Sequence, residues 1–302
     1  MTSSGDQAGT NRAGILYGVA AYGLWGVFPA YFLALHAGPI EILGHRILWS
    51  LAVCLGIVAI QRRWGALGAV FRHRRQLAAA AAAASLISIN WLTYLIAVTT
   101  GRITEAALGY FLNPLVSIAL GLVLLGERLR PPQALAAAVG LLGGGYLAVA
   151  ARTPSWIAAT LACSFGLYGL VKKRLAVGAV VGLTVETAVL VPAAVVVLWW
   201  APDGSTFASR GSTHAALLIG MGVVTAIPLL LFAAAARRVP LVVVGLLQFI
   251  APVLQFLFGL FRGEPMSLHR WIGFAIVWLA LGILILDMLR GSGVLRARGP
   301  AG

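Results

Sequence analysis

The sequence predicts an all-α integral membrane protein, with ten transmembrane helices arranged as two inverted five-helix repeats and both termini in the cytoplasm. Three observations support this prediction: the composition, the distribution of basic residues, and an internal repeat. Of the 302 residues, 61% are hydrophobic and 10% are charged, with a mean hydropathy of +0.96. An average soluble domain carries about 25% charged residues. The composition therefore excludes an ordinary soluble protein.

Charged residues, Pro and Gly divide the chain into ten apolar segments, each close to the roughly 20 residues that a transmembrane helix needs. The predicted spans are 13–35, 39–60, 77–98, 104–126, 133–151, 155–171, 179–201, 213–236, 241–262 and 271–289. The first run is too long for a signal peptide, so we expect it to be retained. The resulting units are an N-terminal tail (1–12), a first repeat (13–151), a second repeat (152–289) and a C-terminal tail (290–302).

The net charge of +14 would suggest nucleic-acid binding in a soluble protein. Here sixteen of the 22 Lys and Arg residues fall on the predicted cytoplasmic side, five fall on the other side, and Arg46 lies inside a span. Basic residues are enriched in cytoplasmic loops, so the charge indicates topology, and no nucleic-acid partner is expected. Lys172, Lys173 and Arg174 should end the short sixth span, with their stems reaching the headgroups.

The second half of the chain repeats the first. AYGLWGV (21–27) aligns with SFGLYGL (164–170), and GPIEILGHR (38–46) aligns with GAVVGLTVE (178–186). Further on, GYFLNPLVSIALG (109–121) aligns with LQFIAPVLQFLFG (247–259). Because five is odd, two five-helix units must be inverted relative to one another, which places a site near the bilayer midplane and favours alternating access. A duplicated scaffold without a transport role is the alternative.

Eight segments occur in a characteristic order along the chain. They are LWGVFPAYF (24–32), EILGHRILWS (41–50), INWLTYLIAV (89–98), GYFLNPLVS (109–117), GERLRPPQ (126–133), SFGLYGLVKK (164–173), PLLLFAAAARRVPL (228–241) and LLQFIAPVLQF (246–256). Together they resemble the RarD family, in the EamA group of the drug/metabolite transporter superfamily. The resemblance covers residues 13–288 and implies a ten-helix carrier of the bacterial cytoplasmic membrane that exports a small metabolite or drug-like compound. It does not specify the substrate.

Ionisable residues inside the spans are the first site candidates, because they are expensive in a membrane unless they are paired or hydrated. Arg46 aligns with Glu186 in the repeat, so the two could pair or bind the two ends of a zwitterion. Alternatively, Arg46 is tied locally to Glu41 or to backbone carbonyls. His45 lies one helical turn after Glu41 and is a candidate proton relay, although a packed, hydrogen-bonded histidine is the favoured reading.

A polar stripe recurs in the fourth and ninth spans, beside Pro114 and Pro252. Each proline frees the carbonyl one turn earlier, which suits a cavity for a polar molecule without strong charge. Hydrogen bonding between helices is the alternative. The stripe comprises Tyr110, Asn113 and Ser117, and at equivalent positions Gln248 and Gln255.

Weaker candidates are Asn90 and Tyr94, one turn apart in the third span, and Trp25 and Tyr168, which could form flat walls for a substrate or simply pack. Three glutamates at span ends are expected to be solvated or to cap helices: Glu105, Glu127 and Glu264. Gly140 and Gly144 form a GxxxG pattern, which is typical of a helix contact or a dimer contact. Cys54 and Cys163 are expected to be buried small side chains.

The chain contains no HExxH, GxSxG or Walker motif and no pair of intramembrane aspartates, so neither an enzyme nor an ATP-driven pump is predicted. No metal or other cofactor is expected. The prediction is a secondary carrier, with a channel, scaffold or receptor subunit as the alternative. Its expected partners are a small-molecule substrate and the lipid bilayer, with protons as a candidate coupling ion and a homodimer as a candidate assembly.

Overall fold

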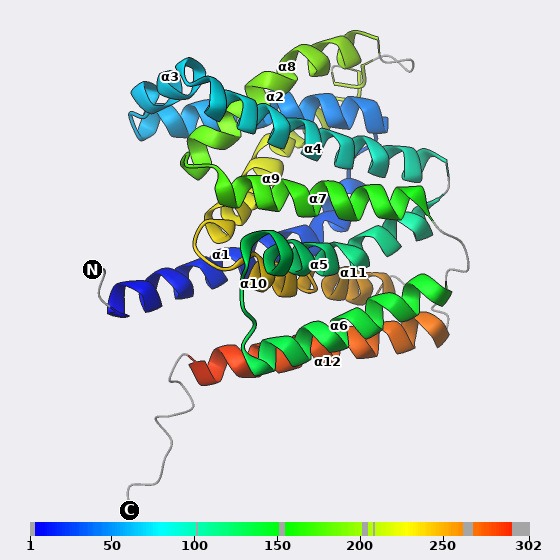
Figure 1. Cartoon of the computed structure of the whole chain (residues 1–302). Helices are drawn as coiled ribbons and strands as arrows, with labels where there is room; N and C mark the ends of the chain where they lie inside the picture. The colour runs from blue at the N-terminus through cyan, green and yellow to red at the C-terminus, as the bar shows by residue number, and fades with distance from the viewer. Residues whose placement is uncertain are drawn as a thin grey trace, which may run out of the picture.

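The computed structural model describes residues 4–100, 102–150, 155–200, 205–207, 209–261 and 268–291. Twelve helices and no strand are present in these segments, and most helices lie side by side along one direction (Figure 1). In chain order they are α1 (Ser4–Leu33), α2 (Pro39–Ile60), α3 (Trp64–Arg72), α4 (Arg74–Thr99), α5 (Ile103–Leu125), α6 (Pro131–Ala150), α7 (Trp156–Arg174), α8 (Ala179–Trp199), α9 (Ser212–Ala236), α10 (Leu241–Leu247), α11 (Ile250–Phe261) and α12 (Leu268–Gly291).

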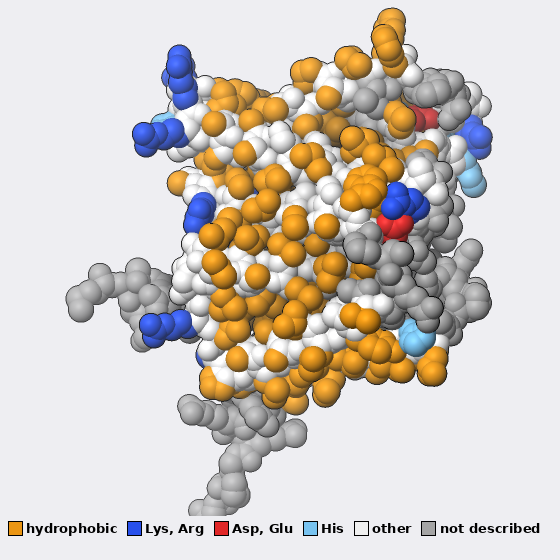
Figure 2. Space-filling view, turned by 45° about the vertical axis from the view of Figure 1, so that its right-hand side comes forward, with side chains coloured by type: hydrophobic (Ala, Val, Ile, Leu, Met, Phe, Trp, Pro, Cys, Tyr) orange, Lys and Arg blue, Asp and Glu red, His pale blue; other side chains and the backbone are white. Residues whose placement is uncertain are grey.

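The outer surface of the bundle is apolar. Large hydrophobic side chains such as Val149, Trp199 and Phe261 are at least 80% exposed, and hydrophobic side chains cover the face shown in Figure 2, with Lys and Arg mainly near its edges. By length and hydropathy, six helices within the described residues could each cross a bilayer, and α12 and the α10–α11 segment contribute shorter apolar stretches. Such a surface is stable only against lipid, so the chain is a multi-pass membrane protein.

The helices coincide with the predicted spans apart from three differences: the early start of α1, the additional helix α3, and the break in the ninth span described below. The predicted N-terminal tail is already helical, because α1 begins at Ser4. The predicted loop between the second and third spans contains α3, a short amphipathic helix whose Leu67 and Val70 are buried against residues of the α7–α8 connection and of α8. The predicted C-terminal tail lies outside the described residues beyond Gly291.

The ninth span is broken, whereas the equivalent α5 is continuous. The chain turns at Gln248 and Phe249, between α10 and α11. Pro252 has no N–H to donate to the carbonyl of Gln248, so the helix ladder is interrupted there. Pro114 occupies the equivalent place inside α5 without interrupting it. An interrupted helix inside a membrane protein leaves backbone groups available to neighbours or to a ligand.

Helices from the two halves of the sequence pack directly on each other. α2 and α8 are antiparallel neighbours (Figure 1), since a Cβ at Gly44, early in α2, would overlap the side chain of Leu198, late in α8. α5 crosses α10 at close range, because the Cα of Gly245 faces the carbonyl oxygen of Pro114. These close approaches depend on glycine, as in other membrane helix pairs.

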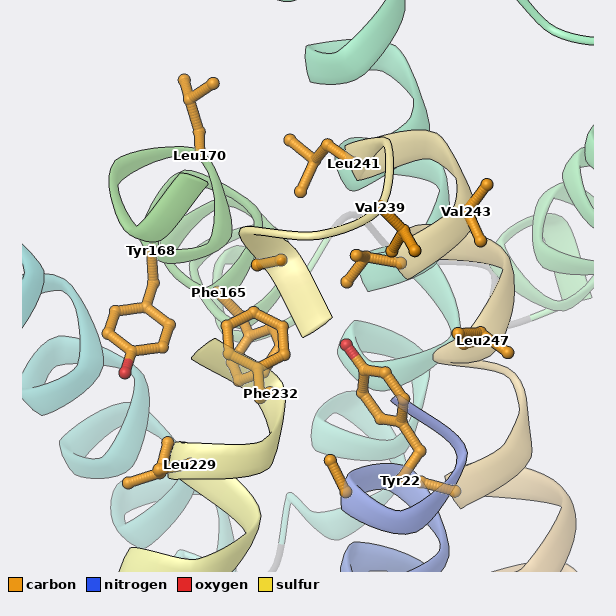
Figure 3. Packing of buried hydrophobic residues seen from close by; sticks show 14 of the residues in the cluster. Tyr22, Phe165, Tyr168, Leu170, Leu229, Phe232, Val239, Leu241, Val243 and Leu247 are labelled. Carbon is orange, nitrogen blue, oxygen red and sulfur yellow. The ribbon is translucent and has the colours of Figure 1, made fainter. Parts of the chain in front are cut away.

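Aromatic rings fill the centre of the bundle, where α1, α7 and α9 meet (Figure 3). Phe232 stacks on Tyr168 with ring centroids 5.6 Å apart, and Phe165 lies 5.2 Å from Phe232. Tyr22 and Trp25 complete the cluster, with centroids 5.3 Å apart. Trp25 and Tyr168, two candidate walls of a substrate site, are therefore members of a packed aromatic core.

Two minor expectations are changed by the packing. Cys54 is buried, as expected, but Cys163 is exposed on α7. A Cβ at Gly140 would overlap Phe249, and one at Gly144 would overlap Leu115. The GxxxG face of α6 is thus a helix contact within the chain, occupied by α5 and the α10–α11 turn.

Candidate functional site

Glu186 is held by two side chains of α7. Lys172 donates from Nζ to Oε1 of Glu186 at 2.6 Å, and the Tyr168 hydroxyl donates to Oε2 at 3.2 Å. Lys172 and Glu186 are only 3% and 1% exposed. The expectation that Lys172 extends to the headgroups is therefore wrong. Helix α7 continues to Arg174 and brings the ammonium group of Lys172 beside the Glu186 carboxylate. Lys173 donates to the carbonyl of Val239, and Arg174 donates to that of Leu124.

Arg46 and Glu186, which align in the repeat, do not form an ion pair. Arg46 and Glu186 lie equally far from the first residues of α2 and α8. Because the two helices are antiparallel, these first residues are at opposite ends of the helix pair, so the two side chains are displaced from one another along it. Glu186 interacts electrostatically with Cys54, which is eight residues beyond Arg46, or about 12 Å along the helix axis. Arg46 is not tied to Glu41 either. Neither Glu186 nor Glu41 is therefore the partner of Arg46, and among the described residues its side chain donates to no backbone carbonyl.

Arg46 lies among side chains of three other helices. Its Nε donates to Oγ1 of Thr225 on α9 at 3.2 Å, and its guanidinium carbon lies 4.4 Å from the ring centroid of Trp91 on α4. It also interacts electrostatically with Tyr94 of α4 and Tyr110 of α5, whose rings are 5.8 Å apart. Within the described residues no carboxylate is within 4 Å of the guanidinium.

The polar stripe of α5 continues from this cluster toward α10. Asn113 and Ser117 are buried, and Ser117 Oγ accepts a hydrogen bond from Nε2 of Gln248 at 2.9 Å. This bond joins the two equivalent stripes across the α5–α10 crossing. The side chain of Gln255 lies outside the described residues, so its place in the stripe is undetermined.

Three buried polar atoms around this crossing have no hydrogen-bond partner among the described residues: the Tyr22 hydroxyl, Oδ1 of Asn113 and Oε1 of Gln248. An unsatisfied buried polar atom costs about 1–3 kcal/mol. Tyr22 faces the side chain of Gln248 without completing a bond of standard geometry. Such atoms commonly mark the position of a water molecule or a ligand.

Asn90 links two helices of the bundle. Its Nδ2 donates to the carbonyl of Leu161 at 2.9 Å and to Ser164 Oγ at 3.1 Å, both on α7. Its amide is therefore used in a contact between helices, whereas Tyr94, one turn later, faces Tyr110 and Arg46. Asn90 and Tyr94, which were expected to act together, therefore contact different groups: Asn90 binds α7, and Tyr94 lies in the Arg46 cluster.

A second polar cluster lies at the start of α2. The structure brings His45 Nε2 to within 3.9 Å of the Glu41 carboxylate, while His45 Nδ1 accepts from Trp49 Nε1 at 3.1 Å. Glu41 also accepts from the backbone N–H and the hydroxyl of Thr206, at 2.6 and 2.9 Å. The hydroxyl of Thr206 in turn contacts His214 Nε2 at 2.8 Å. This cluster ties α2 to the segment before α9.

Of the three glutamates at span ends, Glu127 caps a helix and Glu105 binds two side chains. Gly126 adopts φ +62°, which ends α5 and is accessible to glycine without strain. The adjacent Glu127 then accepts from the N–H groups of Leu241 and Val242, at the start of α10. Glu105 binds Arg102 and the hydroxyl of Ser155, and the bond to Glu105 raises the pKa of Arg102. Glu264 lies outside the described residues.

Sequence reasoning missed Lys172 and Thr225 as site residues. Lys172 follows Tyr168 by one helical turn, and this spacing places both on the face that meets Glu186. Thr225 is the only hydroxyl residue in the long apolar stretch from 215 to 236. A lone polar residue in such a stretch is a signal of a buried partner. No group of three potential metal ligands occurs in the part of the chain that the structure describes.

Comparison with known proteins identifies the family of this bundle. Residues 13–147 match the EamA-like transporter family. Protein RarD of Streptomyces exfoliatus is 49% identical over 95% of this chain and 92% of its own length. Protein RarD of Escherichia coli K12 is 39% identical over 92% of this chain and 95% of its own length. An uncharacterized transporter of Vibrio cholerae is 38% identical over 95% of this chain and 97% of its own length.

The fold also has a solved counterpart. A crystal structure aligns with a TM-score of 0.71 over 92% of this chain and 98% of the other chain, at 19% identity, so the two share a fold. The curated relatives confirm the resemblance seen in the sequence, and they match nearly the whole chain. The chain belongs to the RarD family, in the EamA group of drug/metabolite transporters, and is a membrane transporter.

Proposed function

We propose that this chain is a secondary active transporter of the bacterial cytoplasmic membrane, which exports a small metabolite or drug-like compound by alternating access. Ten spans form two inverted repeats, residues 13–151 and 152–289, which rock against each other around a central site, with both termini in the cytoplasm. The observation that carries this proposal is the packing of the helices, which follows the same pattern in the two halves.

The repeat pairs α1 with α7, α2 with α8, α4 with α9, α5 with α10 and α11, and α6 with α12. If each helix in a principal contact is replaced by its equivalent in the other repeat, the result is again a pair of helices that are in contact. The α5–α7 contact corresponds to the α1–α11 contact, α4–α7 corresponds to α1–α9, and α2–α9 corresponds to α4–α8. The contacts α2–α8, α5–α10 and α6–α12 correspond to themselves. Such exchange symmetry is expected of two repeats with a twofold axis between them.

The directions of the helices support inversion. α2 and α8 occupy equivalent places and run in opposite directions (Figure 1). The first residues of α1 and the last of α12 lie at the same end of the bundle (Figure 1), which agrees with two termini on one side of the membrane. An axis in the membrane plane makes the two halves interchangeable. A structure open to one side therefore has a counterpart of similar energy that is open to the other side.

The proposed substrate site is the polar region between Arg46 and Gln248, centred on α5. Tyr110, Asn113 and Ser117 line its length, and unsatisfied polar atoms occur at Asn113 and Gln248. Because α5 and α10 belong to different repeats, rocking of the repeats would change the contacts of this region directly. The energy source is a proton gradient or the gradient of the substrate itself, and Glu186 is the proposed coupling group.

The test begins with the substrate. Metabolites are compared between cells that contain and lack the protein, and a compound that accumulates in cells lacking it is the candidate. Counterflow of that compound is then measured in proteoliposomes. For a carrier, uptake of the labelled compound should saturate and should be faster when the liposomes contain unlabelled compound. The carrier can then return loaded with unlabelled compound instead of returning empty. Flux without saturation or counterflow would support a channel, and absence of flux would support a scaffold; either result would reject the proposal.

A further inference from the structure

We propose that the central site binds its substrate through a carboxylate group, which the guanidinium of Arg46 holds. The inference rests on the proposed function and specifies its substrate class as small organic carboxylates. The first argument is the charge balance inside the bundle. Arg46 lies inside α2, more than one turn from either end of the helix, and no described carboxylate lies within 4 Å of its guanidinium.

The acidic side chains that the structure describes are all engaged elsewhere. Glu186 neutralises Lys172, Asp287 binds Arg130, and Glu105 binds Arg102. Glu127 caps α10 and also lies 3.4 Å from Lys173, and Glu41 binds the segment before α9. The positive charge of Arg46 is thus not neutralised by any described acid. A charge inside a membrane protein is stable when it is paired, so an anion from outside the chain is the natural partner.

The second argument is the number of free donors. A guanidinium has five N–H groups in a fixed planar fork, and the one at Nε is used by Thr225. Neither terminal nitrogen is hydrogen-bonded in the described structure, and neither is a completely buried unsatisfied atom. The fork is therefore held at its base, and its tip has no hydrogen-bond partner among the described residues. This is the arrangement that receives a carboxylate through two parallel hydrogen bonds.

The third argument concerns the surroundings of the fork. Thr225 and Trp91 fix the guanidinium from two helices, with the indole ring 4.4 Å from its central carbon. Tyr94 and Tyr110 lie near the guanidinium and are partly exposed, as Arg46 is. Their rings would contact an apolar or flat part of a substrate whose carboxylate is on Arg46.

The same geometry argues against a zwitterionic substrate held between Arg46 and Glu186. Glu186 is occupied by Lys172 and is about 12 Å along the bundle from Arg46. The polar groups that follow Arg46 along α5 are a phenol, an amide and a hydroxyl, and none carries a charge. The site thus offers one cation and several neutral hydrogen-bonding groups, which fits a molecule with one negative charge.

The experiment measures binding to the purified full-length protein in detergent by calorimetry and thermal shift. The probes are benzoate, phenylacetate and isobutyrate, each compared with its neutral amide at constant ionic strength. We expect at least one carboxylate to bind at least about tenfold more tightly than its amide, the factor given by a charge-assisted hydrogen bond. Equal binding of acids and amides, or no binding of any carboxylate, would overturn the proposal.

Variants assign the effect to Arg46. Arg46→Gln should weaken carboxylate binding by about tenfold and leave the weak amide binding unchanged. Arg128→Gln is the matched control, because Arg128 is exposed in the connection after α5 and should bind like wild type. Thr225→Val retains the charge but releases the fork, and should weaken binding severalfold. This variant keeps the proposal testable if Arg46→Gln does not fold. Unchanged carboxylate binding in either folded site variant would contradict the assignment.

A chloride titration tests the simplest competing anion. Gluconate replaces chloride in the buffer, and carboxylate binding should persist or strengthen. If chloride binds at Arg46 and no organic carboxylate does, Arg46 is a halide site and the inference fails. If no carboxylate binds but counterflow of the transported compound is intact, only this inference is rejected. Intact binding without any flux would instead reject the transport mechanism.

Discussion

At the scale of single residues, the described interior of the bundle contains a neutralised charge pair and a cation that has no carboxylate within 4 Å. The pair is Lys172 with Glu186, and the cation is Arg46. Breaking a buried pair leaves an uncompensated charge, which costs about 3–5 kcal/mol, whereas replacing both partners is often nearly neutral. The two arrangements therefore predict different consequences of substitution.

Lys172→Met should strongly destabilise the protein, because the Glu186 carboxylate loses its only cation. We expect a loss of about 3–5 kcal/mol, seen as a lower unfolding temperature in detergent. Lys172→Met with Glu186→Gln should recover most of that loss. Lys173→Met is the control on the same turn, because Lys173 is more exposed than Lys172 and its neighbour Glu127 keeps two backbone N–H donors of α10 when the lysine is removed. A Lys172→Met protein as stable as wild type would show that the pair contributes little.

Glu186→Gln tests the proposed coupling role, and because it leaves Lys172 without its carboxylate, the double variant Lys172→Met with Glu186→Gln is measured beside it. Tyr168 and Lys172 donate to different oxygens of Glu186, so a glutamine there, which has a single oxygen, keeps the acceptor for one of them, and its amide cannot take up and release a proton. If the transporter is driven by protons, this variant should lose accumulation against a gradient and retain exchange of substrate across the liposome membrane. Unchanged gradient-driven accumulation would reject Glu186 as the coupling group.

Local spacing predicted some neighbours at this scale, but not the ion pair. Glu41 and His45 are one turn apart on one helix, so their contact follows from periodicity alone. The partner of Glu186 depends on how α7 and α8 pack, and the repeat pointed instead to Arg46. The error has a physical reason: an inverted repeat places equivalent residues at mirrored depths, so they meet only near the midplane.

At the scale of helices, the contact between α5 and α10 is the closest link between the stripes of the two halves. The backbone of Gly245 lies against the carbonyl of Pro114 and the side chain of Ile118. Because one of these atoms is in the backbone, a side chain at 245 cannot be accommodated by a simple change of rotamer. This crossing also carries the hydrogen bond between Ser117 and Gln248.

Gly245→Ala should therefore separate α5 from α10. The added Cβ would lie 2.9 Å from both the Pro114 oxygen and Cγ1 of Ile118, and overpacking of this kind costs about 1–3 kcal/mol. We expect a lower unfolding temperature and weaker substrate binding. Gly145→Ala in α6 is the control, since its Cβ would meet no atom within 4 Å. If the two variants are equally stable, the crossing is more adaptable than this packing implies.

Helix positions were largely predictable, whereas interruptions were not. Hydropathy located the apolar segments because a bilayer imposes a minimum length. The break at Gln248 was hidden because Pro114 and Pro252 align, yet only the second ends a helix. Helix α3 was also missed, because nine residues with a narrow apolar face give too weak a periodic signal between runs of arginine.

At the scale of the whole molecule, the inverted arrangement makes a prediction about sidedness. The connections after the second and seventh spans are equivalent in the repeat, so inversion places them on opposite sides of the membrane. Gln61 lies in the first connection and Ser209 in the second, and both are exposed. Cys54 and Cys163 can be replaced by serine to provide a background without native thiols.

In that background, a membrane-impermeant maleimide applied to intact cells should label Ser209→Cys and should label Gln61→Cys only after permeabilisation. Labelling of both sites from the same side would reject inversion. The reverse pattern would keep inversion but place the termini outside. Exposure of each thiol is controlled by labelling the denatured protein, which must react at both positions.

The repeat was detectable in the sequence because glycines and aromatics recur in register, as in Gly23 with Gly166 and Trp25 with Tyr168. The roles of those aromatics were not detectable. Periodicity places a ring on a helix face, but only the meeting of α1, α7 and α9 determines whether that face meets a substrate or other rings. Here Trp25 and Tyr168 each pack against Phe165 and Phe232, and Figure 3 shows Tyr168 with these two phenylalanines.

The central claim is that two inverted halves expose one site alternately to the two sides of the membrane. Distances between spin labels in liposomes test it most directly, with one pair at Arg128 and Arg237 and another at His36 and Arg210, all exposed positions. On addition of the transported compound, one distance should lengthen while the other shortens. Two distances that stay fixed, or that lengthen together, would contradict alternating access.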